Sequence, residues 1–132
     1  MTRPAGVVGV GLDAVDLDRF RTVLDRRPGI VGRVFTAGER DTAGRRRDPV
    51  PALAARFAAK EAVMKAMGVG LGAVSMVDIE VEGGAGSAPS LVLSGAAARL
   101  ARRLGIDRWH LSLTHTDHQA QAVAVATGTA EA

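Results

Sequence analysis

The sequence predicts an α+β protein in which an antiparallel sheet packs against one long helix and several shorter ones. Its segments follow one another as strand, helices, hairpin, helix and hairpin, which favours an antiparallel sheet over a wound parallel one. The 132 residues are enough for one domain, 1–132, with a real core. Because there are only three Phe, one Trp and no Tyr, that core must consist mainly of small aliphatic side chains.

The first two elements are a strand and a helix. An apolar run over 7–12 predicts a buried strand that ends at Asp13. Asp16 then stands where a helix N-cap is expected, and the helix runs to about Arg27. Its apolar positions are Leu17, Phe20, Val23 and Leu24.

A short helix and a polar loop come next. Thr36 and Glu39 have the spacing of a capping box, so a helix begins there and fades into the loop 44–49. Arg45–Arg47 lies in this loop and resembles a nucleic-acid patch. The run is short, Asp48 follows it, and no aromatic residue for base stacking is interleaved. We therefore expect a solvated loop and no nucleic-acid partner.

The longest predicted helix follows Pro49 and Pro51. Its apolar residues recur with the helical period, and Gly68 is expected to terminate it. Gly68, Gly70 and Gly72 then form a flexible loop, and three glycines in five residues permit a close approach to a backbone or a ligand.

The second half of the chain predicts two hairpins separated by a helix. Residues 76–81 alternate as a strand, and 91–93 return as its partner. A helix over about 95–104 follows, and the strands 109–115 and 119–126 end the pattern. The helices are expected to cover one side of the sheet.

Composition and charge exclude several classes of protein. There are no cysteines, which excludes disulfides and thiolate metal sites and fits a reducing compartment. We find no signal-peptide core and no apolar run of about 18 residues, so we expect a cytoplasmic protein with no membrane partner. Ten arginines lie in the first 50 residues, which predicts attraction to an acidic partner.

Three charges inside the long helix need an explanation. Lys60, Glu61 and Lys65 interrupt an otherwise apolar pattern, and neither an alanine face nor a bulky face resembles a solvated side. One interpretation is that all three are placed for a ligand. The other is that Glu61 and Lys65 form an ordinary i,i+4 pair while Lys60 extends past apolar neighbours to water.

Gly9-Val10-Gly11 formally matches the start of a dinucleotide-binding fingerprint, but the acidic residue expected about 20 positions downstream is missing. An alternative is that Asp13 and Glu61 share a divalent ion such as Mg²⁺, which takes one or two protein carboxylates together with phosphates and water. His115 ends its strand beside Thr114, where a phosphate can be held, although a structural histidine is equally consistent. A zinc site with His110 is disfavoured because residues 110 and 115 of a strand face opposite sides.

Four motifs together resemble the holo-[acyl-carrier-protein] synthase family. They occur in the family's order and spacing, from about residue 7 to 126, as Val8-Gly9-Val10-Gly11-Leu12-Asp13, Arg56-Phe57-Ala58-Ala59-Lys60-Glu61-Ala62 with Lys65-Ala66 and Gly68, Asp78-Ile79-Glu80-Val81, and His110-Leu111-Ser112-Leu113-Thr114-His115. The resemblance implies the 4′-phosphopantetheinyl transferase fold. It also implies transfer of 4′-phosphopantetheine from coenzyme A to a serine hydroxyl of an acyl carrier protein in fatty acid synthesis, with Mg²⁺ required and adenosine 3′,5′-bisphosphate released.

The same resemblance implies roles for individual residues. It makes Asp13 and Glu61 the metal ligands, Lys65 the pyrophosphate contact, and these three with His115 the catalytic set. Coenzyme A is expected to contact Arg56, Lys60, Lys65, Gly68, Gly70, Gly72, Thr114 and His115. The base that takes the serine proton stays open among Asp13, Glu61 and His115.

The resemblance further implies a homotrimer with its cleft between subunits, and an acidic carrier protein as the partner. Both the charge argument and the resemblance indicate that Arg19, Val23 and Arg26 dock this carrier. The rival from another class is a non-catalytic module that binds an acidic partner through the arginine-rich first half, in a salt-sensitive way.

Overall fold

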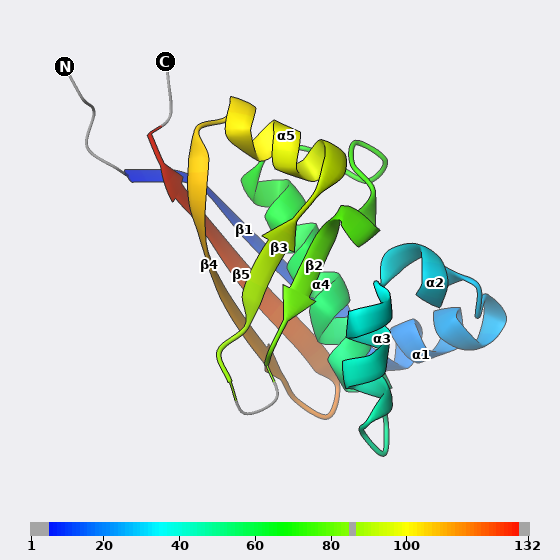
Figure 1. The fold of residues 1–132 in the computed structure, drawn as a ribbon. Coiled ribbons are helices and arrows are strands. Elements are labelled where there is room, and N and C mark those ends of the chain that lie inside the picture. The colour runs from blue at the N-terminus through cyan, green and yellow to red at the C-terminus, as the bar shows by residue number, and fades with distance from the viewer. Residues whose placement is uncertain (1–5, 85–86, 130–132) are drawn as a thin grey trace.

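The computed structural model describes residues 6–84 and 87–129 and has the α+β architecture that the sequence predicts (Figure 1). The elements are β1 (Gly6–Asp16), α1 (Leu17–Arg26), α2 (Ile30–Val34), α3 (Ala37–Gly44), α4 (Val50–Ala66), the 3-10 helix η1 (Met76–Asp78), β2 (Ile79–Glu82), β3 (Ser90–Leu93), α5 (Gly95–Arg103), β4 (Ile106–His115) and β5 (Gln119–Gly128).

The strands form two antiparallel sheets. The larger sheet has the order β1-β5-β4, and the smaller one is the β2–β3 hairpin. Helix α4 packs on one face of the larger sheet and also contacts β2, so it lies between that sheet and the hairpin (Figure 1). The other face of the larger sheet carries exposed apolar residues, among them Val10 and Leu12. The expected arrangement, with helices on one side of the sheet, is confirmed.

The main core lies between α4 and the sheet and consists of small side chains, as the composition predicts. Seven buried residues of α4 are alanines, namely Ala52, Ala54, Ala55, Ala58, Ala59, Ala62 and Ala66. Of these, Ala58, Ala59 and Ala62 share a buried cluster with Ala122 and Ala124 of β5. A second cluster joins α1 and the start of α4, where Phe20 packs edge-on to Phe35 at a centroid distance of 6.5 Å.

Several predicted helix ends are confirmed. The Asp16 side chain accepts a hydrogen bond from the Arg19 amide at 3.0 Å and caps α1. Thr36 and Glu39 form the predicted capping box of α3. Gly68 follows α4 with φ +75°, a conformation that favours glycine. Helix α4 begins before Pro51 rather than after it, because a proline is tolerated in the first turn.

Some elements differ from the predictions. Strand β1 continues to Asp16 because Val15 and Asp16 still pair with β5. Residues 76–78 form a 3-10 turn rather than a strand, so β2 begins only at Ile79. Helix α2, which has five residues, was not predicted, because Gly29 and Gly32 make this segment look like a loop.

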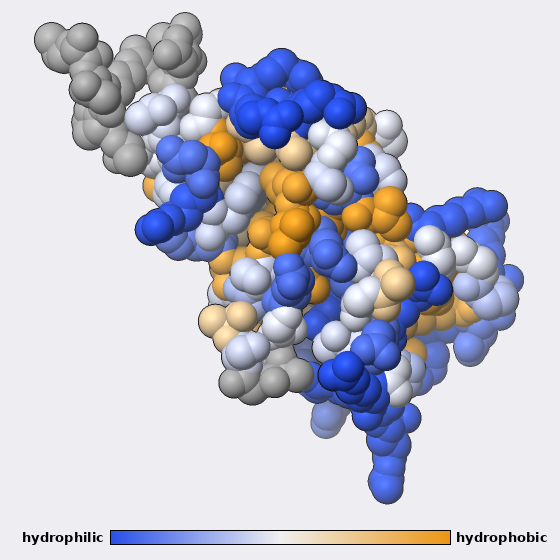
Figure 2. All heavy atoms as spheres, in the orientation of Figure 1, coloured by the Kyte–Doolittle hydropathy of each residue, from blue (hydrophilic) through white to orange (hydrophobic). Residues whose placement is uncertain are grey.

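Hydrophilic residues gather at two parts of the surface. Hydrophilic side chains cover α5 and the loop after α3, where Arg45, Arg46 and Arg47 are all exposed as expected (Figure 2). Within the described residues, no helix is both long enough and apolar enough to span a bilayer.

Candidate active site

Two glycines in β1 bring the carboxylates of β1 and α4 together. A Cβ added at Gly11 would lie 1.7 Å from the Ala62 carbonyl oxygen, and one at Gly9 would lie 1.9 Å from that of Ala66. The backbone of α4 can therefore touch β1 only because both residues lack a side chain. The Gly-x-Gly pattern thus serves close packing of a helix, a role that the sequence analysis did not assign to it.

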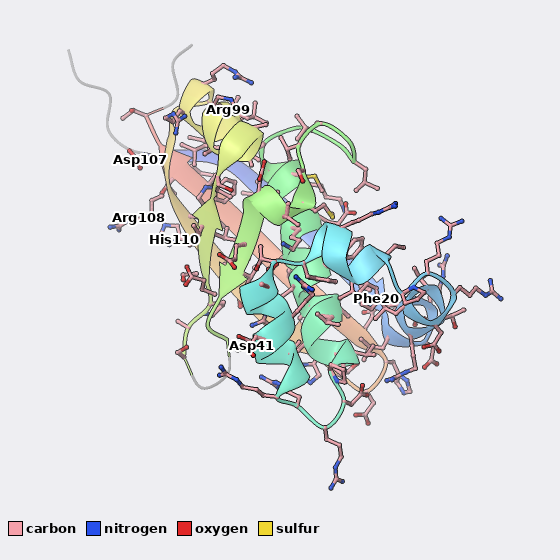
Figure 3. The ribbon with its side chains drawn as sticks, turned by 45° about the vertical axis from the view of Figure 1, so that its right-hand side comes forward. Phe20, Asp41, Arg99, Asp107, Arg108 and His110 are labelled. Atoms are coloured by element: carbon pink, nitrogen blue, oxygen red, sulfur yellow. The ribbon has the colours of Figure 1, made fainter. Side chains whose placement is uncertain are left out.

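This contact places Asp13 and Glu61 at one groove of about 390 Å³. The groove is lined by Asp13, Ala14, Val15, Asp16, Arg19, Phe20, Val23, Phe57, Glu61 and Lys65. It runs between the end of β1, helix α1 and the middle of α4, and Phe20 marks its α1 side in Figure 3. Five residues that the sequence reasoning placed at the site therefore meet here: the two carboxylates, Lys65, Arg19 and Val23.

Lys65 binds Asp13 rather than forming an i,i+4 ion pair with Glu61. Its ammonium donates to Asp13 Oδ1 at 3.1 Å and to the Leu12 carbonyl at 3.0 Å. The Lys65 side chain is 53% exposed and that of Asp13 only 19%. The lysine therefore shields a half-buried carboxylate while keeping its own end open to the groove.

Glu61 is the perturbed acid of the groove. Burial raises the pKa of its carboxyl group, the nearby Asp13 raises this pKa further, and Lys65 opposes both effects. Two neighbouring carboxylates with one lysine between them leave an excess of negative charge that favours a cation.

The prediction that Lys60 contacts a ligand is wrong. Its side chain is fully buried, and its ammonium donates to Glu39 Oε1 at 2.8 Å and to the carbonyls of Met76 and Ile79. Burial lowers the pKa of Lys60, and Glu39 opposes this shift. All three donors are used inside the protein, so no group remains for coenzyme A, and the alternative of an exposed ammonium is equally excluded.

Arg56 does not line the groove. It is 3% exposed, and its Nη2 donates to the Gly83 carbonyl at 2.8 Å. Burial lowers its pKa, and Nε has no hydrogen-bond partner among the described residues. Its predicted contact with a nucleotide stays a prediction.

The remaining predicted ligand contacts lie elsewhere in this chain. Thr114 is in register with Gln121 and Ala14, so it faces away from the side of the sheet that carries Asp13. His115 shares the Asp13 face but lies two strands, roughly 10 Å, from Val15. The loop with Gly68, Gly70 and Gly72 begins after Lys65 and does not line the groove.

Arg26 lies further along α1 at a separate hollow of about 330 Å³ with Arg19 and Val23. The three predicted docking residues therefore form one continuous surface on this helix.

Sequence reasoning missed the apolar wall of the groove. Phe20 and Phe57 pack with their centroids 5.6 Å apart and line the groove beside the carboxylates. For Phe57 a signal exists, because it precedes Glu61 by four residues and thus shares its helix face. For Phe20 there is none, since it lies on another helix and its contact with Phe57 is tertiary.

A larger hollow of about 550 Å³ lies at another part of the molecule. It is lined by Gly6, Val7, Asp107, Arg108, His110 and Thr127, and Figure 3 shows Arg108 and His110 well separated from Phe20. Neither Asp13 nor Glu61 lines this larger hollow, so we place the candidate active site in the smaller groove.

Comparison with known proteins points the same way. A family model described as the 4′-phosphopantetheinyl transferase superfamily matches residues 9–126. A holo-[acyl-carrier-protein] synthase of Frankia casuarinae is 53% identical over 120 residues, which cover 91% of this chain and 97% of the relative.

Two solved structures have the same fold. A complex of the Chronobacterium ammoniagenes synthase with coenzyme A has a TM-score of 0.82 at 29% identity, with 96% of this chain and 98% of that one covered. A Bacillus anthracis holo-(acyl-carrier-protein) synthase in complex with CoA (3′,5′-ADP) has a TM-score of 0.76 at 34% identity, with 92% and 97% covered.

Proposed function

The chain belongs to the 4′-phosphopantetheinyl transferase superfamily, within the holo-[acyl-carrier-protein] synthase family, and from this membership we propose its reaction. It transfers the 4′-phosphopantetheine group of coenzyme A to an acyl carrier protein. The acceptor is a serine hydroxyl, the second product is adenosine 3′,5′-bisphosphate, and the carriers are those of fatty acid synthesis in the cytoplasm.

One observation carries the proposal. Two carboxylates and a lysine, from positions 13, 61 and 65, meet at a groove whose rim carries Arg19 of α1. Carboxylates that bind a cation, together with a lysine, are the groups that neutralise a diphosphate. Arginines beside them suit an acidic protein that must bring a hydroxyl to the same place.

The residues present fit Mg²⁺. Asp13 and Glu61 offer the oxygen ligands that this ion takes. Burial and then the nearby Asp13 raise the pKa of Glu61, and a divalent cation would relieve the repulsion between the two carboxylates. Within the described residues, no cluster of three or more His, Asp or Glu side chains suited to a metal occurs. The donor set that we propose is the pair Asp13 and Glu61. When bound, Mg²⁺ supplies neutralisation of the charge that builds on the diphosphate.

Lys65 supplies the second part of that neutralisation. An ammonium has three N–H donors, and the two hydrogen bonds to Leu12 and Asp13 leave the third for a diphosphate oxygen. In phosphoryl transfer most of the rate enhancement comes from positioning and electrostatics, so we assign Lys65 to the leaving-group side while the serine attacks the β-phosphorus in line. The proton acceptor is Asp13, Glu61 or His115, and pH profiles of Asp13→Asn, Glu61→Gln and His115→Ala separate these candidates.

The carrier protein docks on α1. Arg19 and Val23 line the groove, and Val23 is 44% exposed although it is apolar. Arg26 extends this surface along the helix. Because carrier proteins of this family are acidic, these arginines raise the association rate more than the final affinity, and they orient the serine toward the groove.

We propose that the enzyme is a homotrimer whose sites are completed by a neighbouring subunit. Val10 and Leu12 face away from α4 and are 59% and 63% exposed, which is unusual for large apolar residues of a central sheet. Thr114 lies on this same outer face. Burial of this face against another copy would place Thr114 at the interface, which supports its role at the site of a neighbour, whereas the roles of His115, Arg56 and the Gly68–Gly72 loop there stay predictions. Analytical ultracentrifugation of Leu12→Lys is expected to show loss of the trimer.

The test of the reaction is mass spectrometry of an apo carrier protein incubated with coenzyme A and Mg²⁺. A 4′-phosphopantetheine adduct on the carrier serine is expected. Asp13→Ala and Glu61→Ala should nearly abolish it, whereas Asp41→Ala, on the exposed surface of α3 (Figure 3), should not. Failure of the wild-type protein to form the adduct, or equal rates in all three variants, would refute the proposal.

A further inference from the structure

A buried ion pair lies directly behind the candidate site. Lys60 on α4 and Glu39 on α3 are 0% and 1% exposed, and Nζ lies 2.8 Å from Oε1. Lys60 immediately precedes Glu61, whose carboxylate lines the groove. The pair takes no part in the proposed reaction, because neither side chain reaches the groove.

The pair joins four elements into one unit. Glu39 Oε1 also accepts from the Thr36 amide at 2.9 Å, and Oε2 accepts from the Val81 amide at 2.9 Å. Lys60 donates to carbonyls of η1 and at the start of β2, namely Met76 and Ile79. Helix α4 is thereby tied to α3, η1 and β2 at the residue next to Glu61.

On the opposite side, Lys65 ties the C-terminal end of α4 to β1 by donating to Leu12 and Asp13, and the rest of that side consists of small residues. Its contacts with the sheet are made by alanines and by the glycines of β1. Such a surface lacks the tall ridges and deep grooves by which packed helices set their relative orientation. The sheet side therefore holds α4 close to β1 but supplies few interlocking side chains along most of the helix, and the Lys60–Glu39 network adds fixed directions on the other side.

Stability alone does not account for the pair. Desolvation of two buried charges commonly offsets their attraction, and well-packed apolar residues of similar volume are often equally stabilising. What apolar side chains lack is direction, whereas Lys60 must satisfy three acceptors at fixed places. A pair of this kind specifies one rotational setting of α4.

The precision needed at the groove is high. A side-chain carboxylate lies about 5–6 Å from a helix axis, so a rotation of about 15° displaces it by roughly 1.4 Å. Catalytic constellations must be held to within about 0.5 Å. Mg²⁺ requires near-ideal geometry with ligand distances of about 2.0–2.1 Å.

We propose that Lys60 and Glu39 are positioning residues that set the rotation of α4 and thereby place the Glu61 carboxylate opposite Asp13 for cation binding. This inference rests on the proposed function for its consequence in catalysis. The geometric part of the inference concerns only the positions of the two carboxylates and does not rest on the proposed function.

The experiment replaces the pair by neutral residues of similar shape, Lys60→Met with Glu39→Gln. The matched control is Arg45→Met with Asp41→Asn, which neutralises an exposed pair at the C-terminal end of α3, where the two side chains lie 2.7 Å apart. Three quantities are measured for both: the melting temperature, the dissociation constant of Mn²⁺ alone by electron paramagnetic resonance, and the Mg²⁺ concentration that gives half-maximal transfer.

The buried double variant is expected to fold and to need about tenfold or more Mn²⁺ and Mg²⁺, the scale on which supporting residues affect a metal site. The control pair is expected to match the wild type. If the buried double variant folds and both metal requirements equal those of the wild type, the inference is overturned. If it does not fold, Glu39→Gln alone is measured, and an unchanged Mn²⁺ dissociation constant in that variant overturns the inference equally.

The two hypotheses fail separately. A wild-type protein that transfers nothing refutes the proposed function, while the Mn²⁺ titration still decides the role of the pair. A wild-type protein that transfers normally, with unaltered metal binding in the variants, refutes only the positioning role.

Discussion

Gly11→Ala is the substitution that most directly probes how the site is built. The added Cβ would lie 1.7 Å from the Ala62 carbonyl oxygen, and distances below 3.0 Å essentially never occur for this atom. The contact must therefore lengthen by about 1.3 Å, and because the obstacle is backbone, β1 and α4 have to separate. Overpacking of this kind costs about 1–3 kcal/mol of unfolding free energy.

Separating β1 from α4 is also expected to lower the rate of transfer. Gly11 and Asp13 are two residues apart on one strand face, and Ala62 follows Glu61 directly, so moving α4 away from β1 widens the gap between the two carboxylates. A displacement of about 1 Å in a catalytic constellation can cost roughly 100-fold in rate. We expect a folded protein with a lower melting temperature and a transfer rate reduced by about that factor.

The assay pairs a thermal melt by circular dichroism with the coenzyme A transfer assay. Gly32→Ala is the control, because nothing lies within 4 Å of its added Cβ and it is in a helix, where alanine is the better residue by up to about 1 kcal/mol. It should melt at or above the wild-type temperature and transfer normally. A Gly11→Ala protein that does the same would show that α4 does not depend on this close approach.

Three further outcomes are expected. Lys60→Met alone leaves Glu39 buried without its cation, so urea unfolding should show a loss of about 3–5 kcal/mol, and a loss below 1 kcal/mol would argue against the pair. Burial and Asp13 raise the pKa of Glu61, so the metal-free native state binds more protons than the unfolded chain. The free energy of unfolding should therefore fall as pH rises from about 4.3, the ordinary pKa of Glu, through the raised value. In urea titrations Glu61→Gln should remove this dependence on pH, and an unchanged dependence would assign it to another group. The hydrogen bond from Arg21 lowers the pKa of Asp48. The stabilisation from this pair is therefore present above about pH 3.9 and is lost as pH falls through the lowered value. Arg21→Gln should reduce the melting temperature at pH 6 but not at pH 2, and equal reductions at both pH values would contradict this linkage.

Local patterns predicted the elements because the relevant interactions are short-range. The cap at Asp16, the capping box of Thr36 and Glu39 and the stop at Gly68 each depend on residues within one helical turn. The same approach failed at 76–78, where an alternating pattern predicted a strand. There the Met76 carbonyl is held by Lys60, a residue 16 positions away, and such a contact leaves no local signal.

The charges of α4 show the same limit at the site. From the sequence, Lys60, Glu61 and Lys65 were all candidate ligand contacts. The structure gives the two lysines different partners. Lys60 forms a buried ion pair with Glu39 of α3, whereas Lys65 binds Asp13 of β1 at the groove. Which partner a charged side chain finds depends on the neighbouring element, and an isolated helix does not contain that element.

The amino-acid sequence by itself determined the class of fold, most helices and strands, the small-residue core and the family, because periodicity, caps and motif spacing are written along the chain. Tertiary structure alone decided that two glycines let α4 touch β1, that Asp13 and Glu61 share a groove with Phe20 and Phe57, and that Lys60 belongs to the core. The physical reason is distance along the chain: these contacts join residues from about 20 to nearly 60 positions apart, and only the packing of α4 between two sheets brings them together.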